Sequence, residues 1–185
     1  MRYSAVRIMA ITIRAAIVAD IPALELLIAA SVRTLSTDYY SPSQIESALT
    51  HLFGVDTQLL ADGTYYVAES DGRIVGGGGW SKRQTLFGGD RYKALTDPEL
   101  DPAVDAARIR AFFVHPDFAR QGIGRRLIES CEEAAEEAGF RVFTLVATLP
   151  GQPLYTALGY TVTDWLEILL AEGVLLPAAR MEKVL

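Results

Sequence analysis

One segment in the second half of the chain, residues 109–138, constrains the fold most strongly. Apolar side chains occupy both alternating sets of positions up to Val114, as in a strand that is buried on both faces of a sheet. After a short loop, apolar residues recur at three- and four-residue spacing from Gly122 to Ala138, which is typical of an amphipathic helix. A second apolar stretch, residues 142–146, follows this helix. We therefore predict a strand–helix–strand unit with a right-handed parallel crossover, and a fold of the α/β class.

The start of the predicted helix has the chemistry of an anion-binding site. First-turn amides of a helix lack internal partners and lie at the positive end of the helix dipole. Gly122 and Gly124 carry no Cβ that would keep a phosphate away from those amides. Three cations surround the same turn: Arg120, Arg125 and Arg126. The pattern favours a polyanionic ligand; the alternative is that the glycines only permit a tight loop and the arginines are solvated or pair with Glu129.

Two other phosphate-binding motifs are excluded. A dinucleotide fingerprint requires Gly-x-Gly-x-x-Gly, but its third glycine position is Leu127 here, and the Gly-Lys-Ser/Thr of a nucleoside-triphosphate loop does not occur. The chain carries 23 acidic and 17 basic residues, a net charge of −6, which argues against a general nucleic-acid-binding surface. Any phosphate site in this chain must therefore be local.

Length and composition favour a single cytoplasmic domain. The 185 residues, half of them apolar, suffice for one large core but not for two. The one cysteine, Cys131, cannot form an intramolecular disulfide, so nothing indicates an oxidising compartment. No apolar run reaches the roughly 18 residues that span a bilayer. We expect a leader at residues 1–9, one domain at residues 10–185, and no association with membranes or nucleic acid.

Local patterns predict the remaining elements. Ser41 and Gln44 match a capping box, and Asp71 with Gly72 marks the turn of a hairpin. Asp20 is the expected N-cap of the first helix. The expected elements are a strand at 11–13, helices at 20–32 and 41–52, a hairpin at 64–80, a long loop at 84–107, a helix at 152–158, and strands at 160–170 and 178–184.

Two of these segments leave alternatives open. The four glycines at residues 76–79 indicate either close approach by a ligand or another backbone, or a twisted or bulged strand packed under a helix. Long loops in compact domains usually have a functional role, so the loop at 84–107 either borders the substrate or is a plain surface excursion.

The order of elements and residues 114–127 resemble the GNAT superfamily of acetyl-CoA-dependent N-acetyltransferases, over roughly residues 10–184. Gly122 and Gly124 match the glycines of its Gln/Arg-x-x-Gly-x-Gly/Ala motif, whereas Ala119 stands at the leading position. The resemblance implies a single-domain mixed α/β sheet flanked by helices, in which two central strands splay apart around the pantetheine of the co-substrate. It implies these contacts to acetyl-CoA: Phe112, Phe113, Val114, Ala119, Arg120, Gln121, Gly122, Ile123, Gly124, Arg125 and Arg126.

A second match concerns the chemistry of transfer. Residues 154–160 resemble the family's aromatic-Tyr-x-x-x-Gly-aromatic segment, which implies that Tyr155 protonates the departing CoA thiolate. The alternative is a packing aromatic whose hydroxyl only orders the sulfur. No base for the amine is assigned, because residues 108–114 and 74–82 contain no carboxylate. The open choices are His115 or a water chain to Glu46, Asp38 or a backbone carbonyl, while His51 is expected to be structural.

The predicted reaction is direct transfer of an acetyl group from acetyl-CoA to a primary amine of a small molecule or peptide. A backbone amide of residues 112–114 would polarise the acyl carbonyl. Either Tyr39 or Tyr40 is expected to line the acceptor pocket, the alternative being a buried side chain beside Ser41; Trp80 and Arg110 are further candidates. We expect no metal, and a homodimer is compatible with the sequence. The missing strand carboxylate supports an alternative, a non-catalytic acyl-CoA-binding or sensor module of the same fold.

Overall fold

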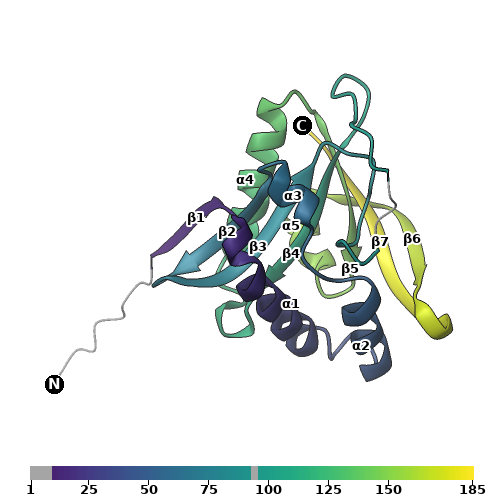
Figure 1. The fold of residues 1–185 in the computed structure, drawn as a ribbon. Helices are drawn as coiled ribbons and strands as arrows, with labels where there is room; N and C mark the ends of the chain where they lie inside the picture. Colours follow the sequence, from purple (N-terminus) through teal and green to yellow (C-terminus); the bar gives the residue numbers. More distant parts are fainter. Residues whose placement is uncertain (1–9, 93–95) are drawn as a thin grey trace.

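A seven-stranded mixed sheet organises the chain, in the order β1-β2-β3-β4-β5-β7-β6 (Figure 1). The computed structural model describes residues 10–92 and 96–185, so the predicted leader lies outside the described residues. All neighbouring strands pair antiparallel except β4 and β5, which are parallel as the crossover prediction required. The strands are β1 (Ile11–Ala15), β2 (Tyr65–Ser70), β3 (Arg73–Ser81), β4 (Ala107–Val114), β5 (Val142–Thr148), β6 (Thr161–Leu169) and β7 (Leu175–Val184).

Helices cover both faces of this sheet. One buried cluster joins the first three helices to the sheet, and other clusters lie under α4 and around α5 on the opposite face. Leu24 and Ile28 belong to the first cluster, while Ile128 and Tyr155 belong to the second. The helices are α1 (Ile21–Leu35), α2 (Pro42–His51), α3 (Thr57–Ala61), α4 (Ile123–Glu137) and α5 (Gln152–Ala157), with single 3-10 turns η1 (Val18–Asp20), η2 (Pro116–Phe118) and η3 (Ala171–Gly173).

Elements with strong local signals form where they were expected. The Ser41 hydroxyl accepts the Gln44 amide while the Gln44 side chain accepts the Ser41 amide, so the predicted capping box starts α2. The hairpin of β2 and β3 turns at Asp71 and Gly72, both at positive φ. Gly139, also at positive φ, follows the end of α4.

Three local details differ from the prediction. The Asp20 carboxylate does not cap α1, because it accepts the Ile17 amide at 2.8 Å and binds Arg14 instead. The short helix α3 was not expected; its cap is Asp56, whose carboxylate accepts two first-turn amides. Strand β7 starts three residues before the predicted position and includes Pro177. That proline is tolerated because the ladder with β5 ends at Ala178, so β7 is paired only with β6 there.

The glycines of β3 make room for neighbouring elements, and each alternative holds at some of them: helices pack on the strand, and at Gly79 another backbone comes close, with the Thr64 carbonyl oxygen 2.7 Å from where a Cβ would lie. A Cβ at Gly76 would lie 2.7 Å from the Ile123 side chain of α4, and one at Gly77 would lie 2.9 Å from Leu24 of α1. At Gly78 the added carbon would overlap the Phe112 ring. These glycines therefore let helices on both faces and one aromatic ring approach the strand closely.

The divergence of β4 from β5 creates the space for a site. Their ladder consists of two pairs, Ala107 with Phe143 and Arg108 with Thr144, after which the strands separate. Beyond those pairs, β4 contains a bulge opposite β3, at which Ala111 has a φ of 60°. The bulge and the divergence leave the second half of β4 facing a gap in the sheet.

Candidate active site

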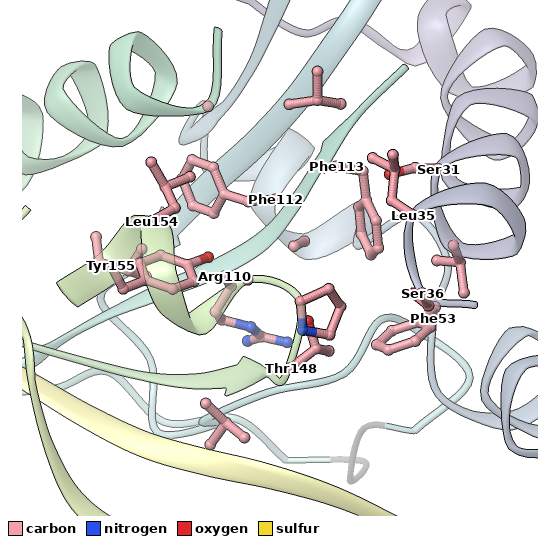
Figure 2. A pocket seen from close by; sticks show the side chains of 18 of the residues that line it. Ser31, Leu35, Ser36, Phe53, Arg110, Phe112, Phe113, Thr148, Leu154 and Tyr155 are labelled. Atoms are coloured by element: carbon pink, nitrogen blue, oxygen red, sulfur yellow. The ribbon is translucent and has the colours of Figure 1, made fainter. Parts of the chain in front are cut away.

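A cavity of about 550 Å³ occupies the gap between β4 and β5. Its walls come from α1, the α2–α3 link, residues 86–89, β4, the start of α4, the end of β5, and α5. Leu154, Tyr155 and Phe112 lie on one side of it, and Ser31, Leu35, Phe53 and Phe113 lie on the other (Figure 2). The first group packs with the elements of the α4 face and the second with those of the α1 face. The cavity therefore connects the two faces of the sheet.

The start of α4 forms the first end of this cavity. Gly122, at a φ of 81°, precedes the helix. Apart from its chain neighbours, no atom lies within 4 Å of the point where a Cβ would be. A Cβ at Gly124 would lie 2.9 Å from the Leu154 side chain. Arg120, itself at a φ of 64°, and Arg125 line the same end. Open first-turn amides, two residues without Cβ atoms and two cations fit a ligand that carries phosphate groups.

Nine of the residues expected to contact a cofactor line the cavity, and two point elsewhere. Gln121 donates its side-chain amide to the Asp117 carbonyl, and Arg126 donates to the Ile11 carbonyl of β1 at 2.9 Å. Arg125 also approaches Glu129 at 3.6 Å, one turn further along α4. The lining residues are Phe112, Phe113, Val114, Ala119, Arg120, Gly122, Ile123, Gly124 and Arg125.

Two consecutive phenylalanines that follow the bulge in β4 lie on opposite faces of the sheet, as neighbouring residues of a strand do. Phe112 covers Gly78 and packs with the clusters of the α4 face. Phe113 packs with the cluster of the α1 face, where its ring meets the Phe53 ring edge-on at 5.6 Å. The backbone between them belongs to the cavity wall.

Tyr155, the expected catalytic acid, lies in α5 with its ring in the cavity wall and its hydroxyl directed into the cavity (Figure 2). The side chain is 9% exposed, and burial raises the pKa of its phenol well above the ordinary value of 10. The phenol therefore keeps its proton at neutral pH.

The aromatic residues expected on the acceptor side differ in position. Tyr39 lines the cavity and is 48% exposed. Tyr40 is buried: its hydroxyl donates to the Pro177 carbonyl at 2.7 Å and accepts the Leu149 amide at 2.9 Å, so it joins the α1–α2 link to β7 and to the residue after β5, and it has the buried, structural position that was the alternative. Trp80 is also buried and packs edge-on against Phe140, away from the residues that line the cavity.

Arg110 lines the cavity, but its guanidinium is engaged by protein groups. It forms an ion pair with Asp56 at 2.7 Å, with both side chains at most 2% exposed. It also donates to the carbonyls of Thr85 and Gly88. Burial lowers the pKa of Arg110 and the Asp56 carboxylate opposes that shift. Arg110 thus connects β4, the cap of α3 and the wall-forming segment that follows β3.

The groups considered as bases are not among the lining residues. Glu46 accepts two hydrogen bonds from Arg33, at 2.8 and 2.9 Å, on the exposed face of α2. The His115 ring contacts Arg73 at 2.6 Å and accepts the Asp117 amide. Asp38 is exposed and outside the cavity wall, and so is His51, which was expected to be structural.

Several residues of the acceptor side could not be identified from the sequence. Phe53 follows α2, Thr148 ends β5, and Phe87 belongs to the loop for which a substrate-side role was one alternative. These residues are far apart in the chain and no motif joins them. The one available signal was the aromatic residue within a long loop rich in glycine.

Two kinds of arrangement are absent from the described residues. No group of three or more His, Cys, Asp or Glu side chains there is arranged to hold a metal ion. In the same part of the chain, no helix combines the length and the apolar character required to cross a bilayer.

Comparison with known proteins identifies the family. Solved structures with the same fold include a GCN5-related N-acetyltransferase from Rhodopseudomonas palustris (TM-score 0.70, 22% identity, 96% of this chain and 98% of that one). They also include PaiA N-acetyltransferase from Thermoplasma acidophilum in complex with coenzyme A (0.65, 15%, 96% and 100%). A third is a polyamine N-acetyltransferase from Drosophila melanogaster, which forms N-acetylagmatine (0.62, 17%, 95% and 100%). No curated protein matches the sequence. Residues 29–160, more than two thirds of the chain, match the acetyltransferase (GNAT) family, and the chain therefore belongs to that family.

Proposed function

We propose that this protein transfers an acetyl group from acetyl-CoA directly to a primary amine. The observation that carries the proposal is the cavity that passes through the sheet between β4 and β5. Its end at α4 suits a phosphate-bearing co-substrate, and its other end, between α1 and residues 86–89, leaves room for a second substrate. Both substrates would meet beside β4 and Tyr155 without a covalent enzyme intermediate.

The residues at the α4 end would hold the pyrophosphate of acetyl-CoA. The amides around Gly122 and Gly124 would donate to its oxygens, and Arg120 and Arg125 would balance its charge. Phe112 and Leu154 would flank the pantetheine chain, since both project into the gap between the strands (Figure 2). This position brings the thioester next to Tyr155.

The reaction breaks one bond and forms another. The amine nitrogen attacks the acetyl carbon, a backbone amide of residues 112–114 stabilises the developing negative charge on the carbonyl oxygen, and the C–S bond then breaks. Tyr155 would give its proton to the departing thiolate, since its raised pKa keeps the phenol protonated beforehand. The amine loses one proton to water, and the phenol regains one from solvent.

The structural neighbours do not identify the acceptor of this chain, because their own acceptors differ. One acts on a polyamine, and another is the ribosomal-protein-S18-alanine N-acetyltransferase of Escherichia coli, with 17% identity and a TM-score of 0.59 over 95% of this chain and 94% of that one. The same fold therefore accommodates both small amines and protein amines, and the acceptor of this chain has to be inferred from its own cavity.

Calorimetry and a thiol-release assay test the proposal. We expect acetyl-CoA to bind and NAD not to bind, and we expect free CoA to appear when a suitable primary amine is added. Arg120→Ala combined with Arg125→Ala should weaken acetyl-CoA binding, whereas Arg141→Ala, on an exposed arginine outside the cavity, is the matched control. Binding of acetyl-CoA without turnover of any amine would favour the non-catalytic sensor, and no binding of any acyl-CoA would exclude both.

A further inference from the structure

The acceptor end of the cavity is built from aromatic and aliphatic side chains. Phe113 and Phe53 meet edge-on there, and Phe87 stacks on Tyr92 with ring centroids 5.2 Å apart. Leu35 and Tyr39 complete this wall from α1 and the residues that follow it. Aromatic walls of this kind bind an apolar ring by offset or edge-to-face packing.

The charges around the cavity do not suit a polycation. None of the described lining residues is an aspartate or a glutamate. The charged residues among them are Arg110, Arg120 and Arg125. Arg110 is paired with Asp56, and the other two lie at the α4 end. A substrate with several ammonium groups would therefore lose its hydration without gaining a carboxylate partner in this wall.

The cavity wall also contains neutral polar groups that would bind a single amine. The hydroxyls of Ser31, Ser36 and Thr148 belong to residues that line the cavity, and all three are labelled around its acceptor side in Figure 2. A few neutral polar groups within an otherwise apolar pocket are typical of a site that orients one functional group of an apolar ligand.

The segment after β3 covers this end and limits the size of the acceptor. Gly89 donates its amide to the Leu52 carbonyl, and Arg110 donates to the Thr85 and Gly88 carbonyls. Arg91 donates to the Leu49 and Phe53 carbonyls. These bonds attach the segment to β4 and to the chain around the end of α2, and they place Phe87 in the cavity wall.

From these observations we infer that the acceptor is a small arylalkylamine, with an aromatic body and no charge besides the reacting amine. The inference rests on the proposed acetyl transfer and narrows its substrate class. The ring would lie among Phe53, Phe87 and Phe113, and the amine would point toward β4 and Tyr155.

A substrate panel tests the inference directly. The probes are 2-phenylethylamine as the arylalkylamine, and agmatine and spermidine as polycations, each with acetyl-CoA in the thiol-release assay. We expect kcat/KM for 2-phenylethylamine to exceed that of either polycation by at least about tenfold. Equal or higher kcat/KM for a polycation would overturn the inference and leave the proposed function intact. Failure of every amine, with acetyl-CoA still bound, would overturn both.

Two variants distinguish an effect of the cavity wall on substrate preference from a general loss of structure. Phe53→Ala should lower kcat/KM for 2-phenylethylamine by about 10- to 100-fold and change agmatine less. Leu35→Glu places a carboxylate at a residue that is 36% exposed, and should raise the ratio of agmatine to 2-phenylethylamine turnover by about tenfold. Trp165→Ala, which removes an exposed aromatic of β6 outside the cavity, is the control and should leave the ratio unchanged. An unchanged ratio in both cavity variants would contradict the proposed acceptor class.

Discussion

The phenols of Tyr155 and Tyr160 have adjacent rings, with centroids 5.8 Å apart, but different surroundings. The Tyr160 hydroxyl donates to Glu132 at 2.7 Å, and the Glu132 carboxylate also binds Lys183. Tyr155 instead directs its hydroxyl into the cavity (Figure 2). Burial is the largest cause of the raised pKa of both phenols. The Tyr160 hydroxyl is therefore bound by a protein group, whereas the Tyr155 hydroxyl remains available for chemistry.

Replacement of Tyr155 by Phe should lower kcat by about 10²- to 10⁴-fold, because the thiolate would leave without an acid. Acetyl-CoA affinity should stay close to that of the parent protein, since the ring is retained. Tyr160→Phe is the matched control: it should lower the free energy of unfolding and leave kcat nearly unchanged. Steady-state thiol release and calorimetry give both quantities. Unchanged kcat in Tyr155→Phe would remove this residue from the mechanism.

The Arg83–Asp62 pair provides a prediction about stability. Arg83 donates two hydrogen bonds to the Asp62 carboxylate, at 2.7 and 2.9 Å, and these hold the pKa of that carboxyl below its usual value. A depressed carboxyl pKa stabilises the folded state above the unfolded pKa of about 3.9, and this contribution is lost as the pH falls through the folded pKa.

Asp62→Asn should therefore lower the free energy of unfolding at pH 7 by about 1–2 kcal/mol. The difference from the parent protein should shrink as the pH falls below about 4, because the unfolded parent chain then binds a proton that its folded form does not yet bind. Urea unfolding between pH 3 and pH 7 measures this difference. A difference that is independent of pH would contradict the role given to the pair.

At the scale of the elements, the glycines of β3 affect the shape of the cavity through the Phe112 ring. Gly78→Ala would place a Cβ against the Phe112 ring, which lines the gap between β4 and β5. We expect a loss of about 1–3 kcal/mol in the free energy of unfolding, and weaker acetyl-CoA binding because the ring must move. Adding Phe112→Leu should recover part of the stability lost in Gly78→Ala, as a double-mutant cycle would show. Additive losses would mean that the two residues do not interact.

Elements with a complete local signal could be predicted from the sequence. The capping box of α2, the turn of the β2–β3 hairpin and the amphipathic stripe of α4 are each determined by residues a few positions apart. The start of β7 depends on its pairing with β6, in which Leu175 lies opposite Leu169, and the role of Asp20 depends on Arg14, a residue in β1. Interactions between neighbouring elements leave no pattern within a single element, so the features that depend on them were misplaced.

The residues of the candidate site divide in the same way, into those that a local sequence pattern identifies and those that only the fold brings together. Residues of β4 and the start of α4 are consecutive in sequence, and the family resemblance covered them. Phe53, Phe87 and Thr148 meet only when the sheet has formed, and the Arg110–Asp56 pair joins residues 54 positions apart. Arg110 was expected to contact the acceptor, whereas its guanidinium binds protein carbonyls and a carboxylate. Sequence alone cannot distinguish an arginine used by a substrate from one used by the fold.

At the scale of the whole molecule, the composition of the cavity predicts the pH dependence of the reaction. The described lining residues contain no carboxylate or imidazole that would act as a base, and Tyr155 remains protonated through the alkaline range because its pKa is raised. The amine itself must then be deprotonated before it attacks. With an arylalkylamine or another alkylamine of pKa about 10, kcat/KM should rise nearly tenfold per pH unit from pH 6 to about pH 9. A plateau that begins near pH 6–7 would reveal an enzyme base.

Two residue pairs, Ala107 with Phe143 and Arg108 with Thr144, join β1–β4 to the half-sheet of β5–β7 through backbone pairing. Backbone pairing thus joins the two half-sheets at one end only, and a co-substrate in the gap would contact both. Amide hydrogen exchange at residues 109–114 and 145–148 should slow when acetyl-CoA is added. The free energy of unfolding should rise by about 2.7 kcal/mol at a ligand concentration 100 times Kd. The co-substrate would then bridge the two half-sheets during each turnover, and product release would leave the gap without that bridge.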